Sequence, residues 1–294
     1  MKSQNVLELP ARPFSRVVQR VQYRFWFWLG MLLVTIMAII TVAPVIWALS
    51  TSLRTPGQSF TLPPKWLPLD PDFKNYADVF VKIPLATYLM NSAVITVSIV
   101  LGQLVTASLA GYAFGRLKFP GRNMIFSLIM ATMMIPLQAT IIPVFVLISR
   151  LNLADTHASL IIPAWATAFG TFLMRQYFMQ IPNEFEEAAV IDGATNVQVF
   201  SKIYLPLAAP GLAILAVLSF NTHWNEFFRP LIFLTTNDNF TLPLGLVTLF
   251  GYLGTGSVSV VMAGVILSLI PVLLVYIVGQ RYLIEGIAMG GVKG

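Results

Sequence analysis

Cysteine is absent from the 294 residues, which excludes a disulfide framework, a thiol nucleophile and a cysteine-ligated metal. Histidine is nearly absent, because His157 and His223 are the only two, and their separation fits no familiar metal-site spacing. Charged residues make up 10% of the chain, whereas a soluble domain usually has about 25%. There is no block of five basic residues, so the net charge of +6 does not indicate nucleic acid as a partner.

Apolar residues dominate the chain. They form 57% of it, and the mean hydropathy is +0.78. Because a helix needs about 20 apolar residues to cross a bilayer, we expect an all-α polytopic membrane protein. The six predicted transmembrane helices cover residues 25–49, 88–112, 124–149, 158–178, 207–225 and 258–278. The first is too long for the apolar region of a cleaved signal peptide, so we expect it to remain as an anchor.

Basic residues near the ends of the spans predict their orientation. Segment 1–24 carries five of them, and the loop after the second span carries Arg116, Lys118 and Arg122 without an acid. We therefore expect a cytoplasmic N-terminal segment 1–24, a single membrane domain over 25–294 and a cytoplasmic tail at 281–294. Both termini and the loop 183–206 then lie in the cytoplasm.

Residues 52–87 are expected to form an external loop. Prolines prevent a continuous helix there, since each lacks a backbone N–H and fixes its own φ. They stand at positions 56, 63, 64, 68, 71 and 84. A short surface helix is expected at 75–80.

The loop 183–206 contains the signals of two short helices. Asn183 followed by Glu186 approximates a capping box, and Thr195 followed by Gln198 repeats the pattern. Gly193 between them suits the left-handed conformation that ends a helix. Pro206 suits the first turn of the next span, where its missing N–H is tolerated.

This loop is acidic, which separates two interpretations. A helix lying on lipid is usually rich in Lys and Arg, because those residues favour anionic headgroups. A docking surface for a soluble protein explains the acids better. The predicted face has Phe185 beside the small residues Ala188 and Ala189, which allow a partner to approach closely.

Polar residues near span five are the first candidates for a substrate path, since polar groups inside membranes usually face an aqueous passage. Asn221 and Asn225, with the aromatic residues Trp224 and Phe228, suit a polyhydroxylated ligand. A structural role at the end of the span explains the cluster equally well. Glu226 and Arg229 are expected to form an ion pair.

Spans two and three add weaker candidates. Asn91 lies in span two, where small polar residues more often join helices than bind cargo. Span three contains Pro136, Gln138 and Pro143, and its prolines are expected to bend it. Gln138 would face a passage if the bent helix lines one.

The spacing of the loop carries a resemblance to a known family. Glu187, Ala188 and Ala189 are followed by Asp192, Gly193 and Ala194, and then by Ile203, Leu205 and Pro206. This order is similar to the EAA loop of the permeases of carbohydrate ABC importers, most closely the maltose-transporter type. Further similar segments are residues 75–76, 111–116, 135–136, 224–227 and 286–294.

The resemblance implies a type I ABC importer transmembrane domain with six helices and a cytoplasmic coupling helix. It implies a second, different permease, two copies of a cytoplasmic ATPase and an extracytoplasmic sugar-binding protein, in the inner membrane of a bacterium. The chain itself has no phosphate-binding Gly-x-x-x-x-Gly-Lys-Ser/Thr segment. We therefore expect no cofactor in this chain, with ATP and Mg²⁺ bound by the ATPase.

Other functions are less well supported. An ion-coupled carrier usually has charges inside its spans and often inverted repeats, and neither is evident in the sequence. An enzyme would need a nucleophile–base pair or a metal cluster. A membrane scaffold would not need the EAA spacing. The identity of the saccharide is beyond the sequence.

Overall fold

The chain is described by a computed structural model over residues 13–55, 68, 70–251 and 256–291. All regular structure in these residues is helical, and no strand occurs among them. The all-α prediction is therefore confirmed. Residues 1–12 and most of the Pro-rich part of the external loop lie outside the described residues.

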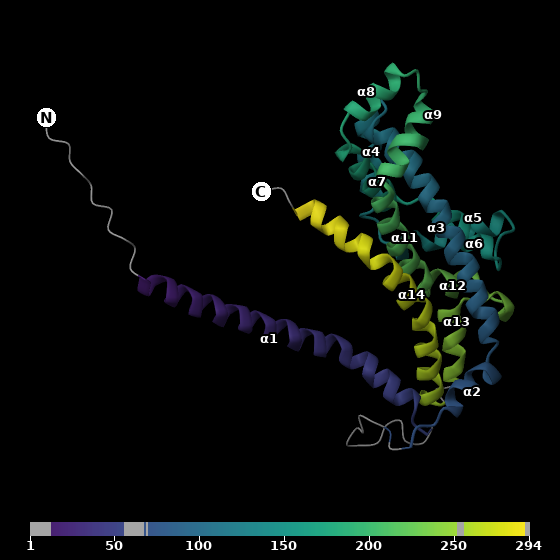
Figure 1. Ribbon diagram of the computed structural model, residues 1–294. Helices are drawn as coiled ribbons and strands as arrows, with labels where there is room; N and C mark the ends of the chain where they lie inside the picture. The colour runs from purple at the N-terminus through teal and green to yellow at the C-terminus, as the bar shows by residue number, and fades with distance from the viewer. Residues whose placement is uncertain (1–12, 56–67, 69, 252–255, 292–294) are drawn as a thin grey trace.

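Four long helices form the main body (Figure 1). They are α3 (Leu85–Gly115), α7 (Ala168–Gln180), α11 (Ala209–Trp224) and α14 (Val258–Gly291). Helix α3 packs along α7 and α11, and α14 covers α11. Helix α14 continues to Gly291, so the predicted tail after 281 is mostly an extension of the last helix.

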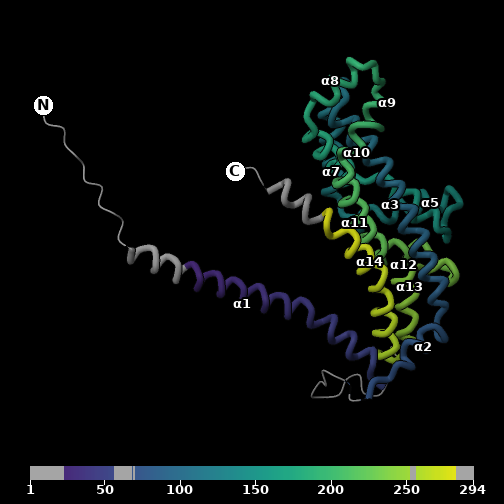
Figure 2. The backbone as a smooth tube through the Cα atoms, in the orientation of Figure 1, coloured from purple at the N-terminus to yellow at the C-terminus, as the bar shows by residue number. Residues whose placement is uncertain are grey.

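Helix α1 (Pro13–Ser52) stands apart from this body, as the tube in Figure 2 shows. The C-terminal end of α1 contacts α14. Its apolar stretch Tyr23–Ser52 is long enough to span a membrane, yet none of its most apolar window is buried in this chain. Apolar surface of this extent needs lipid or another protein against it.

Two spans are bent. Helices α4 (Arg122–Thr132) and α5 (Leu137–Arg150) meet at 100°, and the break ends at Pro136. The predicted bend of span three is thus confirmed. The helical run Asn196–Leu207, which ends in α10 (Leu205–Leu207), meets α11 at 71°. By length and composition the described residues contain four helices able to cross a membrane, or six if each bent pair is one span.

Short helices fill the two ends of the body. At the end where α14 begins lie α2 (Lys74–Lys82), α13 (Leu242–Val247) and the 3-10 turns Asn237–Asn239 and Thr248–Phe250. Helix α2 confirms the predicted surface helix. Helices α6 (His157–Ala164) and α12 (Phe228–Phe233) lie beside α5. Helices α8 (Glu184–Ile191) and α9 (Asn196–Val199) form the opposite end (Figure 1).

Candidate functional site: the α8–α9 knob and the mid-depth network

The segment 183–206 folds as two short helices joined by a tight turn, as predicted. Gly193 has φ +81°, the left-handed region that glycine adopts at little cost. Thr195 and Gln198 form a complete capping box at the start of α9. We call residues 184–199 the α8–α9 knob.

The predicted cap at Asn183 is wrong. Its side chain makes no capping bond to α8, because its oxygen accepts a hydrogen bond from the Arg116 guanidinium instead. Arg116 also donates to the carbonyls of Phe178 and Ile181 at the end of α7. Arg116, the first residue after α3, therefore anchors the entry into the knob.

A second anchor joins the knob to the helix that follows it. The hydroxyl of Tyr204 donates to a carboxylate oxygen of Glu186 at 2.6 Å, and the guanidinium carbon of Arg116 lies 4.8 Å from the centre of the Tyr204 ring. Tyr204 is fully buried, among Tyr112, Phe178 and the half-buried Phe200. The base of the knob is thus a packed aromatic cluster.

The outer face of the knob is apolar and exposed. Phe185 is 50% exposed, Val190 56%, Ile191 85% and Val197 73%. Glu187, Ala188, Asp192 and Gly193 are exposed on the same two helices and their turn, whereas Ala189 and Ala194 pack against the aromatic cluster. The sequence correctly placed Phe185 and Ala188 on this face, but its placement of Ala189 there is wrong, because Ala189 packs against the aromatic cluster. Val190, Ile191 and Val197 were missed.

The last motif residues form a helix with one irregular turn. Residues Phe200–Tyr204 are a π-helix, closed by a bond from the N–H of Leu205 to the carbonyl of Phe200. Pro206 follows directly and has no N–H to continue an ordinary α-helical ladder. Ile203 and Leu205 are half-buried, and the chain bends just beyond, at Ala208.

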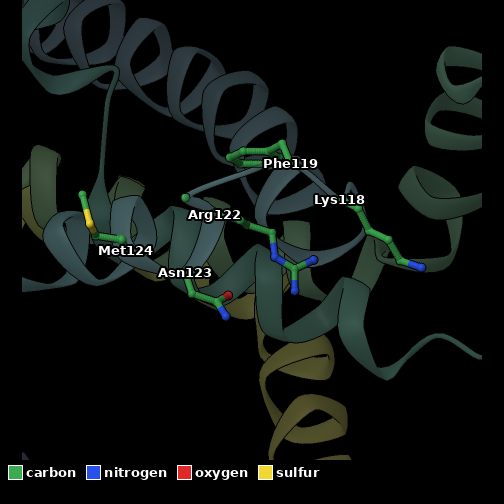
Figure 3. Close-up of a pocket in the computed structure, with 6 residues that line it drawn as sticks. Lys118, Phe119, Arg122, Asn123 and Met124 are labelled. Carbon is green, nitrogen blue, oxygen red and sulfur yellow. The ribbon is translucent and has the colours of Figure 1, made fainter.

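A basic loop lies beside the knob. Figure 3 shows Lys118, Phe119, Arg122, Asn123 and Met124 around a cavity of about 350 Å³ at the start of α4. A second cavity of about 670 Å³ lies between this loop and α8. Its lining includes Arg116, Lys118, Arg122, Glu186 and Glu187. The end of the molecule therefore presents both signs of charge to a partner.

A polar network crosses the body at mid-depth. The Gln103 side chain contacts the His223 ring at 3.1 Å and accepts from the Ser219 hydroxyl at 2.8 Å. His223 contacts Glu226 at 3.0 Å, and Glu226 pairs with Arg229. We call Gln103, Ser219, His223, Glu226 and Arg229 the mid-depth network. Gln103 lies near the middle of α3, so the network meets that helix far from both of its ends.

This position corrects two expectations. The cluster was expected near the end of span five, and it does follow the end of α11 at Trp224, with α12 beginning at Phe228, but this end of α11 lies at mid-depth. A carboxylate, Glu226, also lies at mid-depth, where the sequence indicated none. Its predicted ion pair with Arg229 is confirmed. Arg229 is 8% and Glu226 16% exposed. Because water has little access to either charge, each one needs the other as its partner.

The predicted path residues separate into two groups. Asn221, Asn225, Phe228 and Gln138 have exposed side chains. Asn91 is buried and donates to the carbonyls of Asp238 and Phe240 at 2.7 and 3.0 Å. Trp224 is buried, stacks on Phe220 and donates to the carbonyl of Ser268 at 3.1 Å. Asn91 and Trp224 thus have structural roles, because contacts inside the chain occupy both side chains.

The described residues contain no group of three His, Cys, Asp or Glu side chains arranged to hold a metal ion. What the chain offers is an exposed knob at one end and a buried polar network at mid-depth. The knob has the exposure needed to bind a protein partner. The network holds the break between α11 and α12 in place.

Comparison with known proteins assigns this architecture. Residues 103–288 match the family described as "Binding-protein-dependent transport system inner membrane component". The arabinooligosaccharides transport system permease protein AraQ of Halalkalibacterium halodurans is 38% identical over 246 residues, covering 83% of this chain and 86% of the relative. The diacetylchitobiose uptake system permease protein NgcG of Streptomyces coelicolor is 29% identical over 268 residues, covering 88% and 86%.

The fold agrees with these sequence matches. A crystal structure of a bacterial ABC transporter involved in the import of the acidic polysaccharide alginate contains a chain of the same fold, with a TM-score of 0.79 and 29% identity. The match covers 93% of this chain and 99% of that one. The protein belongs to the family of inner membrane components of binding-protein-dependent transport systems, as an ABC importer permease.

Proposed function

We propose that this chain imports a saccharide as one of two different permeases, driven by an ATPase that binds the α8–α9 knob. The observation that carries the proposal is the outer face of the knob. Four large apolar side chains are half or more exposed there, next to the acidic Glu187 and Asp192. A soluble partner with an apolar groove and basic rim would cover both.

The partners follow from the family and from what the chain lacks. Two copies of a cytoplasmic ATPase would hold ATP and Mg²⁺, one against this knob and one against the second permease. An external binding protein would deliver the saccharide. The basic loop at 116–122 supports a bacterial inner-membrane orientation with the knob and both termini in the cytoplasm, by the excess of Lys and Arg on that side.

The geometry suggests how movement of the knob reaches the membrane. Arg116 ties the knob to α3, and Tyr204 ties α8 to the helix that leads into α11. Because Tyr204 is also packed in the aromatic cluster at the base of the knob, the knob would move with both helices as a unit. Closure of the ATPases would thereby switch the passage between inward-facing and outward-facing states.

The substrate class is proposed from the relatives. Their names specify arabinooligosaccharides and diacetylchitobiose, and the structural neighbour imports alginate. Asn221, Asn225, Phe228 and Gln138 are the proposed contributions of the α11 end and α5 to the passage. Amides give directional hydrogen bonds to hydroxyls, and Phe228 gives a flat apolar surface.

The test is reconstitution of the full complex with a charge reversal in the knob. Glu187→Arg should reduce co-purification of the ATPase and abolish uptake of arabinooligosaccharide, diacetylchitobiose or alginate oligosaccharide in proteoliposomes. Glu184→Arg is the matched control, because Glu184 is an exposed acid of the same helix outside the motif. Normal ATPase binding and uptake by Glu187→Arg would contradict the proposal.

A further inference from the structure

The fourth span, His157–Gln180, is long enough to cross the membrane as one span, but its regular helix is interrupted between α6 and α7, at residues 165–167. We call this interruption the break. Two side chains of α3 take up the carbonyl groups that the break leaves free. The Gln103 amide donates to the carbonyl of Ala164 at 2.8 Å, and the Thr106 hydroxyl donates to the carbonyl of Trp165 at 2.6 Å. The break is therefore a fixed part of the fold.

The break lies at mid-depth. Its contacts on α3 are Ser98, Gly102, Gln103 and Thr106, and these residues surround the middle of that 31-residue helix. Gln103 is also part of the mid-depth network, which holds the C-terminal end of α11 at the same level. The break therefore shares its depth with the α11 residues proposed for the passage.

The break is exposed on the surface of this chain. Trp165 is 42% exposed, and Ala166 is exposed as well. In the described part of the chain the N–H groups of Ala166 and Thr167 have no hydrogen-bond partner. Such groups cost several kcal/mol each in hydrocarbon, so irregular backbone at membrane depth faces protein or water. This face of the chain is not lipid-facing.

The Trp165 ring is held in one orientation. Its indole N–H donates to the carbonyl of Ser98 at 3.2 Å. The ring packs on the backbone of α3 at Gly102, where an added Cβ would lie 2.0 Å from a ring carbon, so only glycine allows this approach. A fixed aromatic ring with part of its surface exposed, beside unpaired N–H groups, has the chemistry of a sugar-binding platform.

We propose that Trp165 binds the transported saccharide at mid-depth, by stacking on a sugar ring while the N–H groups of Ala166 and Thr167 donate to its hydroxyls. This assignment rests on the proposed saccharide import and adds a specific contact to it. Broken spans at mid-depth are where transporters of other folds place their substrate sites, since only there is freed backbone available to a ligand.

The absence of cysteine makes the test direct, because any introduced thiol is the only one in this chain. The complete complex, with partner subunits also free of cysteine, carries Ala166→Cys or Trp165→Cys and is treated with a charged, membrane-impermeant thiol reagent. Ile277→Cys on α14 is the matched control, since Ile277 is 60% exposed in this chain and lies inside one uninterrupted helix.

Both thiols at the break should react at least about tenfold faster than the control thiol on α14 in one state of the transport cycle. Uptake assays with arabinooligosaccharide, diacetylchitobiose and alginate oligosaccharide first identify the saccharide that the wild-type complex imports. Adding that saccharide should then slow the reaction of the thiols with the reagent. Rates equal to the control in the nucleotide-free and ATP-bound states would show that lipid or the second permease covers the break, and would overturn the proposal. Fast labelling that the sugar does not slow would also overturn it.

Transport kinetics give an independent measurement. Trp165→Phe should keep the KM for the sugar within about threefold, and Trp165→Ala should raise it about tenfold with unchanged assembly and ATPase binding. Phe172→Ala, which truncates a 38% exposed aromatic residue on α7, should leave KM unchanged. A wild-type KM for assembled Trp165→Ala overturns the platform. If that variant does not assemble, the labelling of Ala166→Cys and its protection by the sugar decide.

The two proposals fail in different ways. A wild-type complex that imports no saccharide would overturn the proposed function and the sugar contact together. A wild-type complex that imports saccharide, combined with unprotected or unreactive thiols at the break, would overturn only the contact at Trp165.

Discussion

The Tyr204 hydroxyl donates to the Glu186 carboxylate across 2.6 Å and joins α8 to the π-helix that leads into the membrane. The residues are 18 positions apart, and the fully buried Tyr204 lies beneath the half-buried Glu186. Glu186 precedes the Glu-Ala-Ala motif by one residue. The side chain that fixes the inner face of α8 is thus a neighbour of the residues proposed to meet the ATPase.

Tyr204→Phe should loosen this connection. A hydrogen bond to a charged acceptor contributes about 1.5 to 3 kcal/mol, and the partial exposure of Glu186 places this one at the lower end. We expect a lower apparent melting temperature and less saccharide imported per ATP hydrolysed. Tyr177→Phe is the control, because the Tyr177 hydroxyl has no hydrogen bond within the described residues. Equal behaviour of the two variants would contradict a coupling role for the bond.

Substitution of Gly193 separates backbone strain from crowding. An added Cβ would have nothing within 4 Å, so a clash inside the chain is not the issue. The cost of Gly193→Val comes from φ +81° and is about 1 to 2 kcal/mol. We expect Gly193→Val to retain ATP hydrolysis while uptake falls, and Gly193→Asn to keep most uptake, since Asn tolerates this conformation. The ratio of sugar imported to ATP hydrolysed measures the difference.

An inverse result would be informative. If Gly193→Val and Gly193→Asn lose uptake equally, the turn needs glycine for contact with the partner ATPase and not for its backbone angle. Wild-type uptake by both variants would contradict any role of this turn in coupling.

The knob was predictable because its signals are local. Thr195 and Gln198 are three residues apart, and Gly193 is read from its own backbone preference. The predicted cap at Asn183 is wrong for a non-local reason. Its side-chain oxygen accepts a hydrogen bond from Arg116, which lies 67 positions earlier in the chain. A capping preference describes what a residue does in an isolated helix, and here a charged donor from a distant part of the chain takes the same side-chain oxygen.

The mid-depth network was not predictable in the same way. Gln103 and His223 are 120 positions apart, and their contact depends on how α3 and α11 pack. Hydropathy suggested one span ending near residue 225, with no indication that the helix stops at mid-depth. The break at Trp165 was missed although local signals flank it, since Pro163 precedes it and the N-cap residue Thr167 follows it.

Asp155 predicts a dependence of stability on pH. Its carboxylate accepts hydrogen bonds from the Thr236 hydroxyl and from the N–H groups of Thr236 and Thr235, and these hold its pKa well below the ordinary value. A depressed pKa in the folded state stabilises the fold above the unfolded pKa of about 3.9, and this stabilisation is lost as the pH falls below it.

We therefore expect Asp155→Asn to lower the apparent melting temperature by a constant amount from pH 8 to about pH 5. Below about pH 4 the difference from wild type should narrow, because the wild-type carboxylate loses its advantage. Asp78→Asn is the control, since its carboxylate makes no hydrogen bond within the described residues. A gap between wild type and Asp155→Asn that widens with acid would contradict this assignment.

The ion pair of Glu226 and Arg229 allows a test by double substitution. Arg229 also donates to the carbonyl of Leu160 at 3.2 Å, so it joins the α11–α12 break to α6. Removing Glu226 leaves a buried guanidinium without a carboxylate, which costs about 3 to 5 kcal/mol in buried pairs. Arg229→Met alone removes the cation that pairs with Glu226, and among the described residues only His223 then remains as an ion-pair partner.

We expect Glu226→Ala and Arg229→Met each to reduce yield and melting temperature strongly. The double variant should be more stable than the sum of the single losses predicts, because neither charge is then buried alone. The interaction energy from the four proteins measures this coupling. Strict additivity would show that the two side chains act separately, and that Arg229 is held mainly by Leu160 and α6.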